Sequence, residues 1–206
     1  MKPGLLIVVS GPAGVGKGSV IKRVRELTDE VTMSVSATSR EPRPGEISGV
    51  SYFFVTREEF EEMIKKGSLI EWVEYCCNYY GTPREFVSME LEKGHNIVLE
   101  IDVKGSMRIK ELFPESILCF IAPPSFKELT KRLRERKTED EDAIRKRLLR
   151  AREELDFVGD YDYVIINDKI EKAARDFIGI VRTEQMRTSR NKEIIENMKY
   201  KETDFL

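Results

Sequence analysis

The stretch Leu5–Ser19, LLIVVSGPAGVGKGS, constrains the fold more than any other part of the chain. An apolar run is followed at once by the segment from Gly11 to Lys17, which has the G-x-x-x-x-G-K spacing of a phosphate-binding loop, or P-loop. Such a loop ends a strand, turns tightly and begins a helix, so that several backbone N–H groups converge on a phosphate. A glycine-rich turn without a ligand is the alternative, but the order of strand, loop and helix favours the P-loop.

Lys17 is expected to reach the outer phosphates of a nucleoside triphosphate. The residue after this lysine is usually Ser or Thr, but here it is Gly18, and Ser19 comes one place later. The hydroxyl that usually binds the magnesium ion of the nucleotide is therefore missing or shifted.

Composition limits the possible functions of the chain. Its 206 residues suit one domain with insertions or two small domains. A net charge of −2 argues against a general nucleic-acid binder. We find no signal peptide and no apolar stretch long enough to span a bilayer, so we expect a cytoplasmic protein with no membrane partner. The three cysteines are an odd number and predict no disulfide framework, and the single histidine gives no metal-ligand spacing.

Strands alternate with helices along most of the chain, which predicts an α/β fold with a parallel sheet flanked by helices. The expected core strands are Leu5–Val9, Asn96–Asp102, Ser116–Ala122 and Tyr163–Asn167. The expected core helices are Ser19–Leu27, Pro83–Lys93, Val103–Leu112 and one from Asp168 to about Arg187. Ser125 is expected to cap a further helix. The tail after Arg187 gives no pattern that we interpret.

The pattern changes between Ser34 and about Tyr80, where Ser, Thr, Arg, Pro and aromatic residues gather. Short strands are expected at Ser51–Val55 and Leu69–Tyr75, with a helix at Arg57–Lys66 between them. This segment is predicted to be an α+β insertion rather than a continuation of the strand–helix alternation.

Two carboxylates, Glu100 and Asp102, end one of the expected core strands. Strand alternation places them on the same face. Ligands of open parallel sheets bind beyond the carboxyl ends of the strands, so either carboxylate could meet a magnesium ion through water or a donor group of a substrate. The alternative is an acidic residue that caps the next helix.

Arg40 and Arg43 flank a proline in an extended stretch, and the tyrosines at 52, 79 and 80 add hydroxyl donors. Paired guanidinium groups suit a phosphate because each offers a planar fork of donors. On these two arginines alone, an ordinary solvated loop is the favoured interpretation.

Glu71 stands between apolar residues, where a carboxylate is costly to bury without a partner. Guanine offers parallel N–H donors from N1 and N2 that match its two oxygens, whereas adenine presents an acceptor at N1. Ser34 could meet the guanine O6. An exposed strand position is the alternative for Glu71.

The segment from Lys127 to about Glu154 is dense in charge and carries the arginines 132, 134, 136, 145, 147 and 150. Such runs usually form a solvated helical hairpin laced with ion pairs. Beside a P-loop, we favour a mobile lid that brings arginines onto a transferring phosphoryl group.

Together these motifs resemble the guanylate kinase family of P-loop nucleoside-monophosphate kinases, from about Gly4 to Arg187. The segments that carry the resemblance are SGPAGVGKGS, SVSATSREPRPGE, YFF from Tyr52, IEW, NYYGT, LEIDVKG, IAPPS and VIIND. The resemblance implies a core (1–33, 84–126 and 156–206), a GMP-binding insertion (34–83) and a helical lid (127–155). It also implies Mg²⁺-dependent transfer of the ATP γ-phosphoryl group to GMP, and to dGMP, in purine nucleotide metabolism.

The resemblance also assigns site residues by matched position. ATP-binding residues would be Gly11, Pro12, Ala13, Gly14, Val15, Gly16, Lys17, Gly18, Ser19, Arg132, Arg136 and Asn167. GMP-binding residues would be Ser34, Arg40, Arg43, Tyr52, Glu71, Tyr80, Thr82 and Asp102. Lys17, Arg40, Arg136 and Arg147 would be catalytic. Magnesium would be held through ATP and water, with Ser19 or Asp102 as the candidate protein ligand. We expect a monomer or a small homo-oligomer.

The chain departs from the family pattern in the lid, where Glu135 and Lys137 replace two glycines. Glycine would have given flexibility there, so the hinge of the lid is in doubt. Two alternatives remain at this point. One is another small-molecule kinase on the same scaffold, and the other is an inactive binding module related to the family, although such modules have a degraded P-loop.

Overall fold

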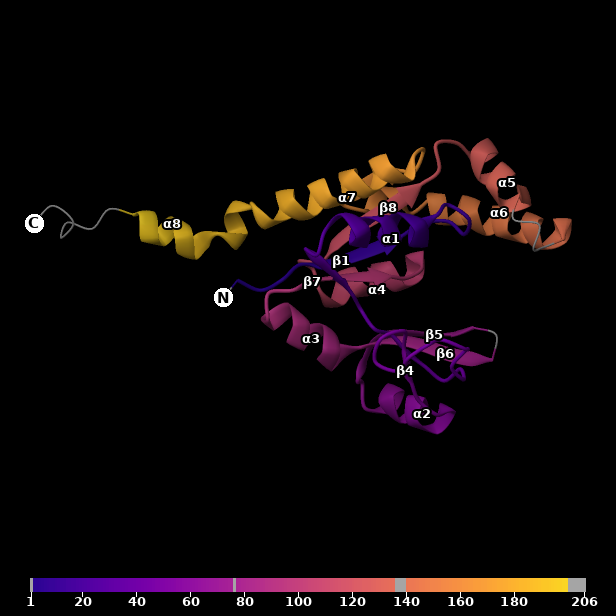
Figure 1. Ribbon diagram of the computed structural model, residues 1–206, viewed down its shortest axis with the longest axis horizontal. Coiled ribbons are helices and arrows are strands. Elements are labelled where there is room, and N and C mark those ends of the chain that lie inside the picture. The colour runs from indigo at the N-terminus through magenta and orange to yellow at the C-terminus, as the bar shows by residue number, and fades with distance from the viewer. Residues whose placement is uncertain (1, 76, 136–139, 200–206) are drawn as a thin grey trace, which may run out of the picture.

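Two β-sheets organise the chain in the computed structural model, which describes residues 2–75, 77–135 and 140–199. The core sheet is parallel, with the strand order β2-β7-β1-β8-β9. Its strands are β1 (Leu6–Ser10), β2 (Val31–Met33), β7 (Asn96–Glu100), β8 (Ile117–Ala122) and β9 (Tyr163–Ile166). The second sheet lies below the core in Figure 1, and α3 (Arg84–Glu92) leads from it back to the core.

Strand β1 is buried on both faces, which explains its unbroken apolar sequence. Ile7 and Val9 pack into one hydrophobic cluster, whereas Leu6 and Val8 pack into the cluster on the opposite face. Because alternate residues point to opposite faces, one short strand anchors both layers of helices.

The helices cover the two faces of the core sheet unequally. The first cluster takes residues from α1 (Lys17–Leu27), α5 (Phe126–Glu135), α6 (Glu141–Leu155) and α7 (Ile170–Gln185). The opposite face is covered by α3 and by α4 (Val103–Leu112). Figure 1 shows α1 and α7 on one side of the sheet and α4 on the other. None of the described helices is long and apolar enough to cross a membrane.

The second sheet has the order β4-β3-β6-β5. Its strands are β3 (Ala37–Thr38), β4 (Phe53–Phe54), β5 (Leu69–Tyr75) and β6 (Asn78–Pro83). Helix α2 (Arg57–Lys65) packs on it through the buried Phe60 and begins with a capping box of Thr56 and Glu59. In the turn between β5 and β6, Cys77 is exposed and has φ = 62°, and Cys76 lies outside the described residues.

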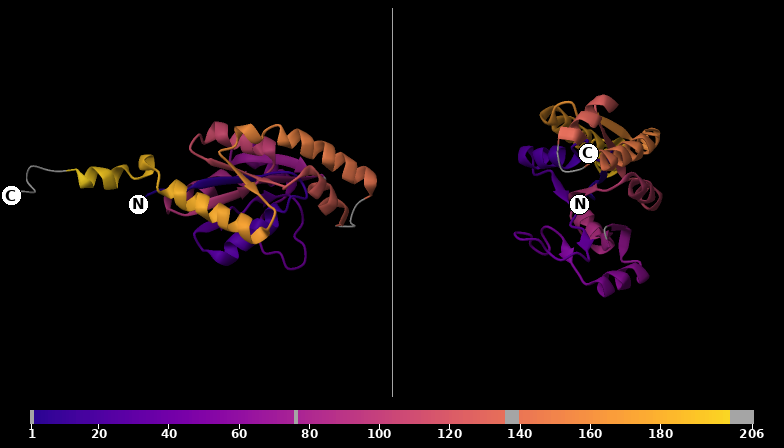
Figure 2. Two further views of the ribbon diagram at one scale, coloured as in Figure 1. Left: turned by 90° about the horizontal axis from the view of Figure 1, so that it is seen from above. Right: turned by 90° about the vertical axis from the view of Figure 1, so that its right-hand side faces the viewer.

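The chain ends in a part that projects from the core. After α7, a 3₁₀ turn at Thr188–Arg190 leads into α8 (Lys192–Met198), which extends away from the two sheets in Figures 1 and 2. A second 3₁₀ turn, Val158–Asp160, joins α6 to β9.

Several predicted boundaries were wrong by a few residues. The first helix begins at Lys17 rather than Ser19, because Gly16 adopts a left-handed conformation that starts the helix early. The last core helix begins at Ile170 rather than Asp168. The strand predicted at Ser51–Val55 covers only Phe53–Phe54. Strands β2, β3 and β6 were not predicted. Strands β2 and β3 have only three and two residues, and the six residues of β6, NYYGTP, show no alternation of apolar and polar side chains. The Ser125 cap is confirmed, because its hydroxyl accepts a 3.1 Å hydrogen bond from the N–H of Glu128.

Candidate active site

The P-loop runs from the end of β1 to the start of α1, at the carboxyl edge of the core sheet. Strand β1 pairs with β7 on one side and with β8 on the other. The later strands therefore lie on both sides of β1, and ligands of open parallel sheets bind at such a switch point in the strand order. Gly11 has φ = 140°, and a Cβ on it would lie 2.2 Å from the carbonyl oxygen of Ile121. Only glycine lets the loop pass this close to β8.

Lys17 is folded back onto its own loop. Its ammonium group donates to the carbonyl oxygens of Gly11 and, at 3.3 Å, Pro12. Burial lowers the pKa of Lys17, and the carboxylates of Glu100 and Glu154 oppose that shift. The ammonium group is therefore held at the mouth of the loop, close to two carboxylates.

One cavity of about 690 Å³ extends from the P-loop to the second sheet. Its P-loop end is lined by Gly11, Ala13 and Lys17. Its opposite end is lined by Ser34, Tyr52, Glu71, Tyr80 and Thr82. Five further charged residues line the cavity: Glu100, Asp102, Arg147, Arg150 and Glu154. The volume suits small ligands, and the lining is polar at both ends.

Glu71 is buried at the far end of this cavity, with 9% of its surface exposed. Its Oε1 accepts a 2.6 Å hydrogen bond from the hydroxyl of Thr82. Burial raises the pKa of Glu71, with a further contribution from the negative charge of Asp102. The hydroxyl of Ser34 is also buried, and it has no hydrogen-bond partner among the described residues. This end of the cavity thus presents a desolvated carboxylate beside an unsatisfied hydroxyl.

A β-bulge in β5 places Glu71. Leu69 pairs with Pro83, but Trp72 pairs with Gly81, so β5 carries one extra residue between these pairs. A Cβ on Gly81 would lie 2.8 Å from the carbonyl oxygen of Glu71. The bulge therefore needs a glycine opposite it.

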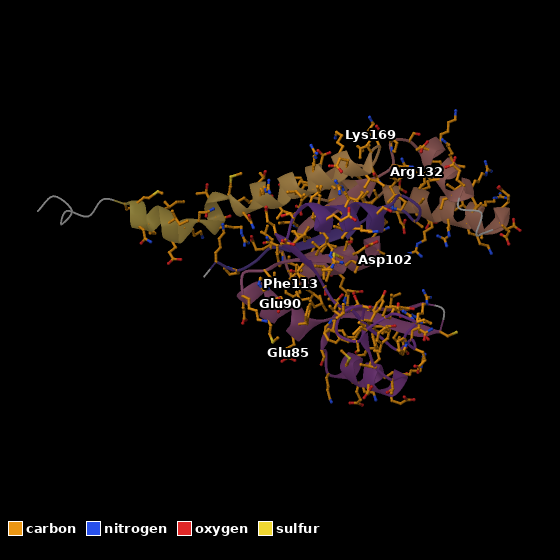
Figure 3. The ribbon with its side chains drawn as sticks, in the orientation of Figure 1. Glu85, Glu90, Asp102, Phe113, Arg132 and Lys169 are labelled. Carbon is orange, nitrogen blue, oxygen red and sulfur yellow. The ribbon has the colours of Figure 1, made fainter. Side chains whose placement is uncertain are left out.

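Asp102 both caps a helix and lines the cavity. Its Oδ1 accepts from the N–H of Gly105 at 2.9 Å, which caps α4, and its Oδ2 accepts from Arg150 at 3.2 Å. Figure 3 shows Asp102 on the side of the core that faces the second sheet. The predicted helix cap is therefore confirmed, and the binding of a ligand by Asp102 stays a prediction that its place in the cavity allows.

Glu100 lies beside the end of the P-loop. A Cβ on Gly18 would be 3.8 Å from Oε2 of Glu100, so this carboxylate flanks the position where a P-loop usually carries Ser or Thr. Desolvation raises the pKa of Glu100, and Lys17 opposes the shift. Ser19 is exposed and does not line the cavity.

Neither arginine of the predicted phosphate clamp lines the cavity in this structure. Arg40 makes a 2.9 Å ion pair with Glu46, and its guanidinium carbon lies 5.6 Å from the ring centre of Tyr52. Since Tyr52 does line the cavity, Arg40 is one side chain away from it. Arg43 is exposed, and its backbone N–H donates to Glu46.

The arginines of the predicted lid are separated. Arg147 lines the cavity, whereas Arg132 does not. Arg132 pairs with Glu128 and donates to the carbonyl oxygen of Asn167, and Figure 3 shows it away from the second sheet. The side chain of Asn167 in turn donates to the carbonyl oxygen of Val15 in the P-loop at 2.7 Å. The predicted Arg136 lies outside the described residues.

Arg150 and Glu154 also line the cavity. Arg150 was predicted only as one of several arginines of the charged segment, and Glu154 was not predicted as a site residue. Their i, i+4 spacing on α6 fits an ordinary helix ion pair, so the sequence alone favours a surface role. The hydrogen bond of Arg150 to Asp102, which is 48 residues earlier in the chain, shows that this pair faces the cavity instead.

Comparison with known proteins identifies the family of the chain and confirms its fold class. A family model described as guanylate kinase matches residues 4–184. The chain belongs to the guanylate kinase family. It is 47% identical to a guanylate kinase of Caldanaerobacter subterraneus subsp. tengcongensis, covering 94% of each chain. It is 49% identical to one of Shouchella clausii, covering 94% of this chain and 96% of that one. The crystal structure of guanylate kinase from Anaplasma phagocytophilum is 34% identical, covers 96% of each chain and has a TM-score of 0.74.

Proposed function

We propose that this member of the guanylate kinase family binds ATP at the P-loop and GMP at the second sheet, and transfers the γ-phosphoryl group between them in the cavity. Membership of the family makes the chain a phosphotransferase enzyme. The observation that carries the proposal is the shared cavity of Lys17 and the buried Glu71. One end suits phosphates, and the other suits a base with parallel N–H donors.

Guanine is the base that fits the far end best. Its N1–H and one N2–H match the two oxygens of Glu71, and its O6 accepts from Ser34. Its second N2–H would donate to Asp102, which lies close enough that its charge raises the pKa of Glu71. Adenine would place an acceptor against the Glu71 carboxylate and leave buried donors and acceptors unpaired, which is costly.

The acceptor phosphate would lie near Tyr52 and Tyr80, which line the same end of the cavity as Glu71. Arg40 stacks on Tyr52, and we propose that it exchanges Glu46 for the phosphate of GMP. Arg43 would close from the same loop. A phosphate oxygen is already anionic at neutral pH, so the reaction needs no general base, and catalysis is positioning with charge neutralisation.

The donors at the P-loop fit a magnesium ion that arrives with ATP. Magnesium prefers oxygen ligands and usually binds one or two carboxylates, phosphate oxygens and several waters. Glu100, which flanks Gly18 of the P-loop, offers such a carboxylate. Of the two candidate ligands from the sequence, Asp102 is assigned to guanine here, and Ser19 is exposed and outside the cavity. The ion would neutralise charge on the phosphates. Lys17 would turn from the loop carbonyls to the outer phosphates.

Helices α5 and α6 would form the lid. Arg147 already lines the cavity, while Arg132 would reach the triphosphate only after leaving Glu128 and Asn167. Lid closure would exclude water, which otherwise competes as the acceptor. Arg136 is proposed as a further lid arginine on the resemblance alone. Use of dGMP, a cytoplasmic location and a monomer or small homo-oligomer also belong to the proposal.

A coupled assay of ADP formation tests the proposal. ATP and magnesium would be combined with GMP, AMP, CMP or UMP in turn. We expect strong turnover with GMP alone. Preference for another monophosphate would overturn the guanine site, and the absence of turnover despite ATP binding would favour a binding module.

A further inference from the structure

Arg150 joins helix α6 to Asp102 at the start of α4. It lies near the end of α6, and its guanidinium group donates to Oδ2 of Asp102 at 3.2 Å and, through Nε, to Oε1 of Glu154 at 2.9 Å. All three side chains line the cavity. Arg150 therefore bridges two carboxylates from separate elements, one at the start of α4 and one on its own helix.

Glu154 fixes the direction of that bridge. Its side chain is 13% exposed, against 59% for Arg150, so the carboxylate is the fixed end of the pair and the arginine reaches out from it. The other carboxylate oxygen, Oε2, is buried and has no partner among the described residues. With its Nε held by Glu154, the planar fork of Arg150 is aimed at Asp102.

Asp102 is thereby held from two sides. The N–H of Gly105 occupies Oδ1, and Arg150 occupies Oδ2. Each carboxylate oxygen has a second lone pair, so a third donor can still bind without displacing either partner. Two donors from separate elements therefore fix the orientation of the Asp102 carboxylate at the wall of the cavity that it lines.

We propose that Arg150 is a positioning residue for base selection, which orients Asp102 to accept the second N2–H of the purine and is itself held by Glu154. The inference rests on the proposed guanine site. It separates Arg150 from the lid arginines, because its action is on the base rather than on the transferring phosphoryl group. Since Arg150 is largely exposed, its ion pairs contribute little to folding, and its removal should leave the fold intact.

The test compares GMP with IMP, whose base lacks the 2-amino group, at saturating ATP. The wild type should prefer GMP in kcat/KM. In Arg150→Ala, the GMP preference should fall about tenfold, mainly through the KM for GMP, while the KM for ATP and the melting temperature stay unchanged. Asp102→Asn should show a similar loss of preference. The double variant should lose no more than Asp102→Asn alone, because the two residues act as one unit.

Two further variants sharpen the result. Glu154→Gln keeps the side-chain shape but weakens the anchor, so part of the preference should be lost. Arg152→Ala is the matched control, since Arg152 is an exposed arginine on the same helix that does not line the cavity, and its preference should equal that of the wild type.

Three outcomes would overturn the inference. Equal losses with GMP and IMP in Arg150→Ala would mean that the arginine acts on phosphate or on the lid. Additive losses in the double variant would mean that it does not act through Asp102. In both cases the guanine site stands if Asp102→Asn still lowers the GMP preference. A wild type with no GMP preference would overturn the proposed function as well.

Discussion

The hydroxyl of Thr82 on β6 donates a 2.6 Å hydrogen bond to the buried carboxylate of Glu71 on β5. This pair forms across a β-bulge, and both side chains line the same cavity as Lys17. Desolvating a carboxylate costs free energy unless hydrogen-bond donors offset that cost. One hydroxyl donor offsets only part of it, so Glu71 can accept further hydrogen bonds from a ligand with N–H donors.

Replacing Glu71 with Gln should impair use of GMP and leave ATP binding unchanged. The amide keeps the size of the side chain but loses one acceptor and the charge that two guanine N–H groups require. Loss of a hydrogen bond to a charged group predicts a rise in the Kd for GMP of about tenfold to a hundredfold. Calorimetric titration with each nucleotide measures this. Equal weakening of ATP and GMP would point to a folding defect.

Binding of GMP should weaken as the pH falls through the raised pKa of Glu71. Burial raises this pKa, with Asp102 adding to the shift, so the folded protein takes up the proton at a higher pH than the unfolded chain. Protonation favours the fold, and this contribution is lost as the pH rises through the folded pKa. Guanine needs the ionised form of Glu71, so GMP binding strengthens as the pH rises, whereas this contribution to folding stability weakens.

Binding titrations with GMP from about pH 8 to about pH 5 test whether Glu71 causes this pH dependence. The phosphate of GMP also titrates in this range, so Glu71→Gln serves as the reference, because it retains the titration of the ligand. The difference between wild type and variant should grow smaller as the pH falls. Parallel curves would exclude Glu71 as the titrating group.

Gly81→Ala should disturb the acceptor site without touching any group that is proposed to bind GMP. The new Cβ would lie 2.8 Å from the carbonyl oxygen of Glu71 and 3.0 Å from the ring of Phe60, so the bulge must shift. We expect kcat/KM for GMP to fall about tenfold or more, with the KM for ATP unchanged. Gly159→Ala is the control, because a Cβ there meets nothing within 4 Å. Unaltered GMP kinetics in Gly81→Ala would show that the bulge does not position Glu71.

Arg40→Ala should lower kcat/KM for GMP about a hundredfold, because the acceptor phosphate loses its orienting group. Arg40→Lys should rescue little, since an ammonium cannot stack on Tyr52 and bind phosphate through a planar fork. Steady-state kinetics with Arg57→Ala provides the control, as Arg57 is an exposed arginine that does not line the cavity. Kinetics of Arg40→Ala that match this control would remove Arg40 from the clamp.

The P-loop and the core strands could be predicted from the sequence because their signals are local. An apolar run, a fixed glycine spacing and a following helix all lie within Leu5–Leu27. The family itself also followed from motifs in order along the chain, and the comparisons confirm it.

What the sequence could not predict depends on contacts between distant residues. The bulge that aims Glu71 exists only because β5 and β6 pair with a one-residue shift. The ion pair of Arg40 with Glu46 keeps this arginine out of the cavity, although its spacing suggested a phosphate clamp. Arg150 reaches Asp102 from another helix, and nothing in its own i, i+4 pattern indicates that contact.

A crystal structure with adenosine and guanosine joined through a pentaphosphate would test the central claim most directly, because that compound spans both substrates. Our account predicts guanine against Glu71 and Ser34, the adenosine-side phosphates on the P-loop beside Lys17, and the linking phosphates along the cavity between them. Guanosine bound away from Glu71, or phosphates bound away from the P-loop, would contradict the account.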